Sequence, residues 1–251
     1  MSLPRPIITL LSDFGLADYY AAAMKAVLLR HGPNAVLVDV THQIPPQDIL
    51  HGSIVLERAI ASFPAGTVHL AVVDPGVGSS RRIILARSNQ QLIVCPDNGL
   101  ITWTLRRFPQ TTVSELIWRP PSASHTFHGR DIMAPIAGQL AAGAAPEQFA
   151  QPLITPVLLD IQLATGALGK IIHFDHFGNA TTNIPSQLVP PDKSIRVNNY
   201  DLGPLRHSYA DVPRSQPLAI IGSSDLLEIA VNSSSARDLL ELKVGDVVTV
   251  E

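Results

Sequence analysis

An aspartate and an arginine seven residues apart are the first pair in the sequence that could do chemistry together. Asp74 follows the apolar run 68–73, and Arg81 follows the turn sequence Pro75-Gly76-Val77-Gly78. Ligands of open α/β sheets bind at the carboxyl ends of strands, where Asp74 would lie if the run is a buried strand. The glycines let the backbone approach a bound molecule closely. The pair therefore predicts a pocket faced by a carboxylate and a guanidinium, and an ordinary solvated turn is the alternative.

Further polar groups are expected at the same edge of the sheet. Asp13 follows the apolar run 6–12, and His128 lies just before a helix predicted over about 132–142. The free N–H groups of a helix start disfavour a protonated imidazole, so His128 is expected to be neutral. A histidine hydrogen-bonded beside a helix cap is the alternative. Because these side chains come from separate loops, their convergence is the main indication of a site. The turn Asp175-His176-Phe177-Gly178-Asn179 in the second part of the chain adds further polar residues to it.

Three familiar kinds of site lack their sequence signatures. The chain has no His-Glu-x-x-His or Cys-x-x-Cys spacing, so no metal is expected. The run Gly76-Val77-Gly78 lacks both the Walker lysine and the full dinucleotide-binding fingerprint. The G-x-S-x-G turn of serine hydrolases is missing as well.

The elements that must position these residues alternate between strands and helices. Strands are predicted over 6–12, 35–40 and 68–73. The helices between them are expected to be capped by Asp18 and Asp48. A hairpin over 83–86 and 92–94 should extend the sheet. This alternation predicts a parallel sheet with helices on both faces.

The second part of the chain has a different pattern. Residues 151–165 are rich in proline and lack periodicity, which is typical of a linker. After them come short apolar runs separated by turn residues, with one helical turn at 235–240. The predicted fold class is therefore α/β. An N-terminal α/β domain (1–150) has a mostly parallel central sheet, and a smaller C-terminal domain (166–251) is a β-barrel.

Composition narrows the function classes. Hydrophobic residues make up 46% of the 251 residues and charged ones 16%, which is typical of a well-packed protein with room for an oligomer interface. A net charge of -3 and a pI near 6.3 argue against nucleic acid as a partner. The single cysteine, Cys95, lies in an apolar run and is expected in the core. Neither a signal peptide nor a membrane span is apparent, so a cytoplasmic location is expected.

Seven motifs in order resemble the S-adenosyl-L-methionine (SAM) hydroxide adenosyltransferases, the water-using relatives of the fluorinases and chlorinases. The motifs are Leu11-Ser12-Asp13-Phe14-Gly15, Val40-Thr41-His42-Gln43-Ile44-Pro45-Pro46, Val72-Val73-Asp74-Pro75-Gly76-Val77-Gly78, Asp97-Asn98-Gly99, Phe127-His128-Gly129-Arg130-Asp131, Phe177-Gly178-Asn179 and Leu227-Glu228-Ile229-Ala230-Val231-Asn232. The resemblance implies an N-terminal α/β domain and a C-terminal β-barrel. It also implies a homotrimer with active sites between neighbouring subunits, and SAM as substrate without a further cofactor.

The resemblance also implies roles for individual residues. Asp74, Arg81 and His128 match the set that handles the attacking water, and Asp13 matches the carboxylate that holds the ribose hydroxyls. Positions near the methionine part of SAM are matched by Asp18, Asp175, Ser223 and Glu228, and positions around adenine by Asn179, Val231 and Asn232. The run Ser223-Ser224-Asp225 departs from related sequences, which often have other small or basic residues there.

The implied reaction is an in-line displacement at C5′ of the ribose by water, with neutral methionine leaving. Free hydroxide at pH 7 is disfavoured by about 12 kcal/mol, so the site must take a proton during attack. Asp74 beside Arg81 should be a poor base that orients the water, while Arg81 stabilises negative charge. His128 is better matched to accept the proton. The sequence leaves open which of Asp74 and His128 does so.

Two other functions are compatible with the motifs. A halogenase would form a halogenated adenosine, but a carboxylate in the pocket repels halide. A sensor would bind SAM or adenosine without turnover, but it would not need a set of residues that activates water.

Overall fold

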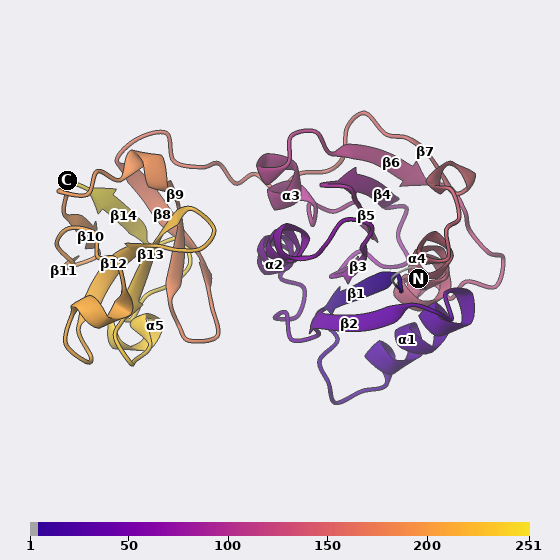
Figure 1. The fold of residues 1–251 in the computed structure, drawn as a ribbon, viewed down its shortest axis with the longest axis horizontal. Coiled ribbons are helices and arrows are strands. Elements are labelled where there is room, and N and C mark those ends of the chain that lie inside the picture. The colour runs from indigo at the N-terminus through magenta and orange to yellow at the C-terminus, as the bar shows by residue number, and fades with distance from the viewer. Residues whose placement is uncertain (1–4) are drawn as a thin grey trace. The chain divides into compact units, whose positions relative to one another are not determined.

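Seven strands form one sheet in the first part of the chain in the computed structural model, which describes residues 5–251. This part, described from residue 5 to residue 159, is one of two structural units, and residues 160–251 form the other (Figure 1). The strands of the first unit are β1 (Ile7–Ser12), β2 (Val36–Thr41), β3 (Val68–Val72), β4 (Ile83–Ser88), β5 (Gln91–Pro96), β6 (Thr112–Leu116) and β7 (Ala150–Pro152). Its helices are α1 (Tyr20–His31), α2 (Ile49–Ser62), α3 (Thr102–Arg107) and α4 (Ala134–Ala141).

The sheet is mixed rather than mostly parallel. Its strand order is β2-β1-β3-β5-β4-β6-β7, and the pairs among β2, β1, β3 and β5 are parallel. The pairs from β5 outward to β7 are antiparallel. The predicted hairpin is confirmed as β4–β5, but it joins the sheet with β5 beside β3. From β5 to β7, each strand therefore runs opposite to its neighbour. The predicted parallel arrangement is confirmed for the other half of the sheet, β2, β1, β3 and β5, whose strand ends lie near the candidate site.

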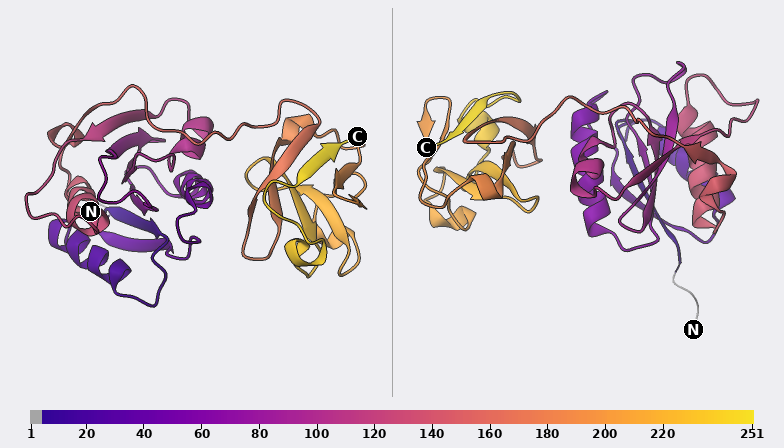
Figure 2. Two further views of the ribbon diagram at one scale, coloured as in Figure 1. Left: turned by 180° about the vertical axis from the view of Figure 1, so that it is seen from behind. Right: turned by 90° about the horizontal axis from the view of Figure 1, so that it is seen from above.

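Helices cover both faces of this sheet. One face carries α1 and α4, and the other carries α2 and α3 (Figure 2). Neighbouring strand residues accordingly enter different cores: Leu10 and Leu70 pack with α1 and α4, while Leu11 and Ala71 pack with α2. This explains the continuous apolar runs of the central strands, because both faces of each strand are buried. Cys95 on β5 is fully buried, as expected, and burial raises the pKa of its thiol.

The two predicted helix caps have different outcomes. Asp48 caps α2, since its Oδ1 accepts a hydrogen bond from the backbone N–H of His51 at 2.9 Å. The prediction that Asp18 caps α1 is wrong. The cap residue is Tyr19, which makes no side-chain cap bond, and Asp18 lies one residue too early with its side chain exposed.

Residues 155–159 are attached to the first unit. Arg82 forms an ion pair with the buried carboxylate of Asp97, and it also donates to the carbonyl of Thr155 at 3.0 Å. The other oxygen of Asp97 accepts from the N–H of Val157 at 2.8 Å. Residues 155–159 lie within the predicted linker 151–165, and these hydrogen bonds hold them at the start of β4 and the end of β5.

The second unit is an open antiparallel sheet. Its strands are β8 (Leu168–Phe174), β9 (Ala180–Pro185), β10 (Ile195–Val197), β11 (Tyr200–Asp201), β12 (Pro217–Ile221), β13 (Leu226–Val231) and β14 (Val247–Val250), with one short helix, α5 (Ala236–Leu239). The strand order is β11-β10-β14-β8-β9-β13-β12, and no pairing within residues 5–251 joins β11 to β12. The sheet curls around one apolar core but is not the closed β-barrel that was predicted, since a barrel requires its two edge strands to pair.

A buried polar chain crosses the sheet of the first unit. Gln91 uses its amide N–H groups to donate to the carbonyls of Ile60 and Phe63, so its oxygen accepts from Nε2 of His69. Nδ1 of His69 then accepts from the hydroxyl of Thr9 at 2.6 Å. The neutral imidazole is thus the form that fits, and burial lowers the pKa of His69 although the bond to Gln91 acts in the opposite direction.

The buried hydrogen bonds of His69 with Thr9 and Gln91 lead us to expect that acid destabilises the protein. Between the lowered pKa of His69 and about 6.5, the unfolded state binds a proton that the folded state does not. The free energy of unfolding should therefore fall as pH drops below about 6.5, by up to about 1.4 kcal/mol per pH unit for one histidine. Burial also lowers the pKa values of His51 and His128, so they add to the effect.

The measurement is urea unfolding at about pH 7.5 and about pH 5.5. His69→Gln removes one titrating group and should make the dependence on pH shallower. Equal unfolding free energies at the two pH values in the unmodified protein would contradict the prediction.

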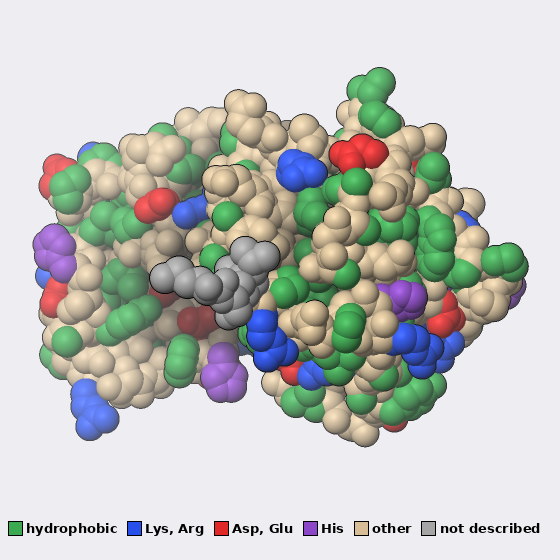
Figure 3. Space-filling view, turned by 45° about the vertical axis from the view of Figure 1, so that its right-hand side comes forward, with side chains coloured by type: hydrophobic (Ala, Val, Ile, Leu, Met, Phe, Trp, Pro, Cys, Tyr) green, Lys and Arg blue, Asp and Glu red, His purple; other side chains and the backbone are tan. Residues whose placement is uncertain are grey.

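Charges on the surface are mixed. On the face drawn in Figure 3, acidic and basic side chains are interspersed rather than gathered by sign, as a formal net charge of -3 suggests. None of the helices within residues 5–251 combines the length and the apolar character that crossing a membrane requires.

Candidate active site

Three predicted residues, two from the loop after β3 and one from the segment before α4, meet at the carboxyl end of β3. Asp74 follows this strand, and its two oxygens accept hydrogen bonds from Nε and Nη2 of Arg81, the first at 2.7 Å. Nη2 of Arg81 also lies 3.1 Å from Nδ1 of His128. The side chains of Asp74 and Arg81 are only 5% and 9% exposed. The structure thus brings together the carboxylate, guanidinium and imidazole as a connected, largely buried set.

The contact with Arg81 defines the protonation of His128. An arginine nitrogen can only donate, so Nδ1 of His128 accepts and the neutral ring carries its proton on Nε2. Partial burial and the positive charges of Arg81 and Arg119 lower the pKa of His128, although Asp74 acts in the opposite direction. Both observations favour the neutral imidazole at pH 7.

The guanidinium of Arg81 retains one unused donor. Its Nη1 is buried and has no hydrogen-bond partner among residues 5–251. A buried N–H group without a partner is costly unless a water molecule or a ligand satisfies it. Arg81 therefore holds Asp74 and His128 in place and keeps one N–H donor that neither residue uses.

Local backbone geometry explains why the loop carries glycine. Gly78 has φ +82°, and a Cβ built on it would lie 2.5 Å from the carbonyl oxygen of His125. Any side chain here would be strained and would push apart the two loops that carry Arg81 and His128. On the other side, Gly129 begins a π-helical turn, Gly129–Met133, and packs against Val72. Such turns often mark functional sites, and this one carries His128 at its start.

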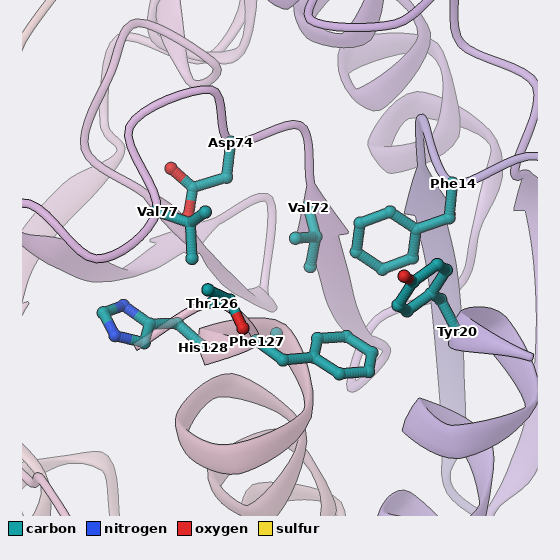
Figure 4. Close-up of a pocket in the computed structure, with 9 residues that line it drawn as sticks. Phe14, Tyr20, Val72, Asp74, Val77, Thr126, Phe127 and His128 are labelled. Atoms are coloured by element: carbon teal, nitrogen blue, oxygen red, sulfur yellow. The ribbon is translucent and has the colours of Figure 1, made fainter. Parts of the chain in front are cut away.

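A cavity of about 190 Å³ opens beside this set (Figure 4). Asp74 and His128 lie on one side of it, and Phe14 and Tyr20 lie on the other, with Val72 between them. The remaining lining residues are Val77, Thr126, Phe127 and Gly129. The cavity is therefore polar at one end and aromatic at the other.

The loop after β1, which carries Asp13 and Phe14, is held by hydrogen bonds to His42 and Gln47. Nε2 of His42 lies 3.0 Å from a carboxylate oxygen of Asp39, and Nδ1 lies 2.7 Å from the hydroxyl of Ser12. The carbonyl of His42 accepts from the N–H of Gly15 at 2.7 Å. Asp13 itself accepts from the N–H of Gln47 at 2.8 Å. Asp13 thus lies at a strand end as expected, although it does not line the cavity.

A second cavity, of about 630 Å³, lies in the second unit. Three of the predicted residues line it: Asp175, Asn179 and Val231. The carboxylate of Asp175 accepts from the N–H groups of Phe177 and Asn179 and from the side-chain amide of Asn179. Asp175 therefore shapes the turn and holds the side-chain amide of Asn179 in place.

The other predicted residues lie outside these two cavities. Asp18 and Ser223 are exposed, the first in the loop before α1 and the second in the turn between β12 and β13. Glu228 accepts from the hydroxyl of Tyr209, which lines the second cavity. The amide of Asn232 donates to the carbonyl of Val212 at 2.7 Å.

Aromatic lining residues were not predicted as site residues. In the first cavity these are Phe14, Tyr20 and Phe127, and in the second they are Phe177 and Tyr209. Phe177 is 74% exposed. Its strongly apolar side chain within a polar turn was the feature of the sequence that could have indicated a binding residue. Tyr209 lies in a segment without periodicity, and nothing in the sequence around it indicated a binding residue. No group of three or more His, Cys, Asp or Glu within residues 5–251 could hold a metal ion.

The fold and the site define a two-unit protein with an α/β half, an antiparallel half and a carboxylate–arginine–histidine site at a strand end. Family models for the N-terminal and C-terminal domains of the SAM hydroxide adenosyltransferases match residues 8–150 and 169–249. The chain belongs to this family.

Individual relatives agree with this assignment. The (R)-S-adenosyl-L-methionine hydrolase of Thermus thermophilus is 41% identical, over 96% of this chain and 97% of the relative. The protein of the same name from Salinispora tropica is 38% identical, over 97% of each chain. A fluorinase from Actinoplanes is 27% identical, over 98% of this chain and 97% of the relative. A crystal structure of an uncharacterized conserved protein from Thermotoga maritima has a TM-score of 0.89 at 35% identity, covering 97% of this chain and all of that one.

Proposed function

We propose that this protein hydrolyses SAM to adenosine and L-methionine by attack of water at C5′ of the ribose. The observation that carries the proposal is the buried Asp74–Arg81–His128 set beside a cavity, in a chain that is 41% identical to a SAM hydrolase. The new C5′–O bond forms as the C5′–S bond breaks, and both electrons of the broken bond stay on sulfur. The second water proton goes to a base in the site.

Asp74 is the proton acceptor in this mechanism. The hydrogen bond from Arg81 occupies Nδ1 of His128, and Nε2 already carries a proton. Asp74 lines the cavity and keeps a free lone pair on each oxygen after pairing with Arg81. As the water oxygen bonds to carbon, its protons become strongly acidic, so a carboxylate is a sufficient base. His128 and Arg81 then keep Asp74 oriented, and Arg81 stabilises negative charge.

The remaining predicted residues bind the rest of the substrate. Asp13 holds the ribose hydroxyls, and Asn179 and Val231 in the second cavity hold adenine, with Asn232 beside them. Asp18, Asp175, Ser223 and Glu228 serve the methionine end. The two cavities belong to different units, so in this proposal a homotrimer combines them between neighbouring subunits. The domain limits 1–150, 151–165 and 166–251, the absence of a cofactor and a cytoplasmic location also stay predictions.

Incubation of the purified protein with SAM in ¹⁸O-labelled water tests the reaction. One ¹⁸O atom should appear in the 5′-hydroxyl of adenosine and none in methionine, as read by mass spectrometry. Label in methionine, or adenosine without label, would contradict attack of water at C5′.

The same assay separates the two alternatives. A halogenase would form a halogenated adenosine at high chloride concentration. A sensor would bind SAM without forming adenosine. Labelled adenosine as the product at high chloride excludes both.

A further inference from the structure

The end of the first cavity away from Asp74 is a wall of three aromatic rings, Phe14, Tyr20 and Phe127, here called the aromatic wall. The ring centroids lie 5.7 Å apart for Phe14 and Tyr20, 5.7 Å for Phe14 and Phe127, and 5.3 Å for Tyr20 and Phe127. Phe127 meets each of the other two rings edge to face, at 80°. The rings therefore support one another and form a fixed surface.

The charges around the cavity suggest that the aromatic wall helps to bind a cation. Asp74 is the only carboxylate among the lining residues, and the positive charge of Arg81 neutralises it. The sulfur of SAM carries a permanent positive charge. Aromatic faces are the other lining groups that attract a cation. Phe127 already receives one, since the guanidinium carbon of Arg130 lies 4.9 Å from its ring centroid.

In-line displacement places the charged sulfur at this wall. The attacking oxygen, C5′ and the sulfur lie in one line, with the sulfur opposite the oxygen. Figure 4 shows Asp74 and His128 on one side of the cavity and Phe14 and Tyr20 on the other. A water molecule held at the Asp74 side therefore directs the sulfur toward the aromatic wall.

We propose that Phe14, Tyr20 and Phe127 recognise the sulfonium group through cation–π interactions and make the cavity selective for it over a neutral thioether. This inference rests on the proposed hydrolysis of SAM. When the C5′–S bond breaks, its electron pair stays on sulfur and the positive charge is lost. The attraction to the rings ends at that point, which favours release of methionine.

The wall predicts a characteristic kinetic effect. The sulfur is fully charged in the bound substrate and loses charge in the transition state, so the rings stabilise the substrate more. Phe14→Leu and Tyr20→Leu should raise KM for SAM by about 2- to 30-fold, the range expected for one cation–π contact. The value of kcat should stay the same or rise, because the interaction removed belongs to the ground state.

The test compares the binding of SAM with that of S-adenosylhomocysteine, its neutral thioether counterpart. Both dissociation constants are measured by calorimetry in an Asp74→Asn background, in which turnover is suppressed. Phe14→Leu and Tyr20→Leu should weaken SAM binding about fivefold and thioether binding less than twofold. Phe14→Tyr keeps an aromatic face and should retain the preference for SAM.

Equal weakening of both ligands would show that the wall is only an apolar surface and would overturn the inference. Unchanged SAM binding in both leucine variants would overturn it as well. These measurements depend on binding and not on turnover. A protein that binds SAM but forms no labelled adenosine would contradict the proposed hydrolysis and still allow the two ligands to be compared.

Discussion

Replacing Asp74 by asparagine is expected to lower kcat for SAM hydrolysis by about 10²- to 10⁴-fold, the range typical of removing a general base. An asparagine side chain has an NH₂ group in place of one carboxylate oxygen, so one of the two N–H groups that Arg81 directs at Asp74 would face a donor instead of an acceptor. It is also too weak a base to take a proton from the attacking water. Adenosine formation under single-turnover conditions measures the effect on the chemical step.

A matched variant separates loss of catalysis from loss of stability. Breaking a buried ion pair can cost about 3–5 kcal/mol of stability by itself. Asp97 after β5 is buried to a similar degree, with its side chain 1% exposed, and pairs with Arg82 at 2.6 Å. Asp97→Asn should lower the melting temperature as Asp74→Asn does but leave kcat within about threefold. A kcat of Asp74→Asn close to that of the unmodified protein would contradict the role of Asp74 as base.

Arg81→Lys is expected to lower kcat by about 10²- to 10³-fold, the loss typical of removing an electrostatic donor from an active site. Lysine keeps the positive charge but carries its donors on one nitrogen. It cannot span both oxygens of Asp74 and Nδ1 of His128, as the planar guanidinium does. The geometry of the set should be lost while its net charge stays the same. Steady-state kcat and KM for SAM are the measurements.

The neighbouring arginine provides the control for this variant. Arg82 also pairs with a buried aspartate, Asp97, but at the attachment of residues 155–159. Arg82→Lys should therefore affect stability more than kcat. An equal fall of kcat in both variants would indicate a general disturbance of this region rather than a role for Arg81.

Strand ends in the first unit were predictable because burial on both faces leaves a clear signal. The apolar runs before Asp13 and Asp74 are confirmed as β1 and β3. The mixed direction of the sheet was not, since nothing in the hairpin 83–96 indicates which of its strands lies beside β3. Strand β9 was missed because Thr181, Thr182 and Asn183 are polar, yet all three are buried in the structure. Tertiary packing overrides local pattern at such positions.

For the candidate site, polar residues were predictable and apolar ones were not. Asp74, Arg81 and His128 follow turn or helix-start signals, which allowed their convergence to be predicted. Phe14 and Phe127 resemble ordinary core residues in the sequence, and only the structure places them in one cavity. The hydrogen bonds of His42 with Asp39 and Ser12 depend on the orientation of its imidazole ring, which the spacing of residues in the sequence does not predict.

Arg81 and Arg82 are consecutive residues that serve different aspartates, one after β3 and one at the end of β5. A single-residue deletion between Asp74 and Arg81 would bring Arg82 to Asp74 and leave Asp97 without a guanidinium, whereas an insertion would bring Arg81 to Asp97 and leave Asp74 without one. Either change would therefore damage the reaction site or the anchor of residues 155–159. Length changes in this loop should therefore be far less tolerated than substitutions, and a graft of the loop into another scaffold must keep the seven-residue interval.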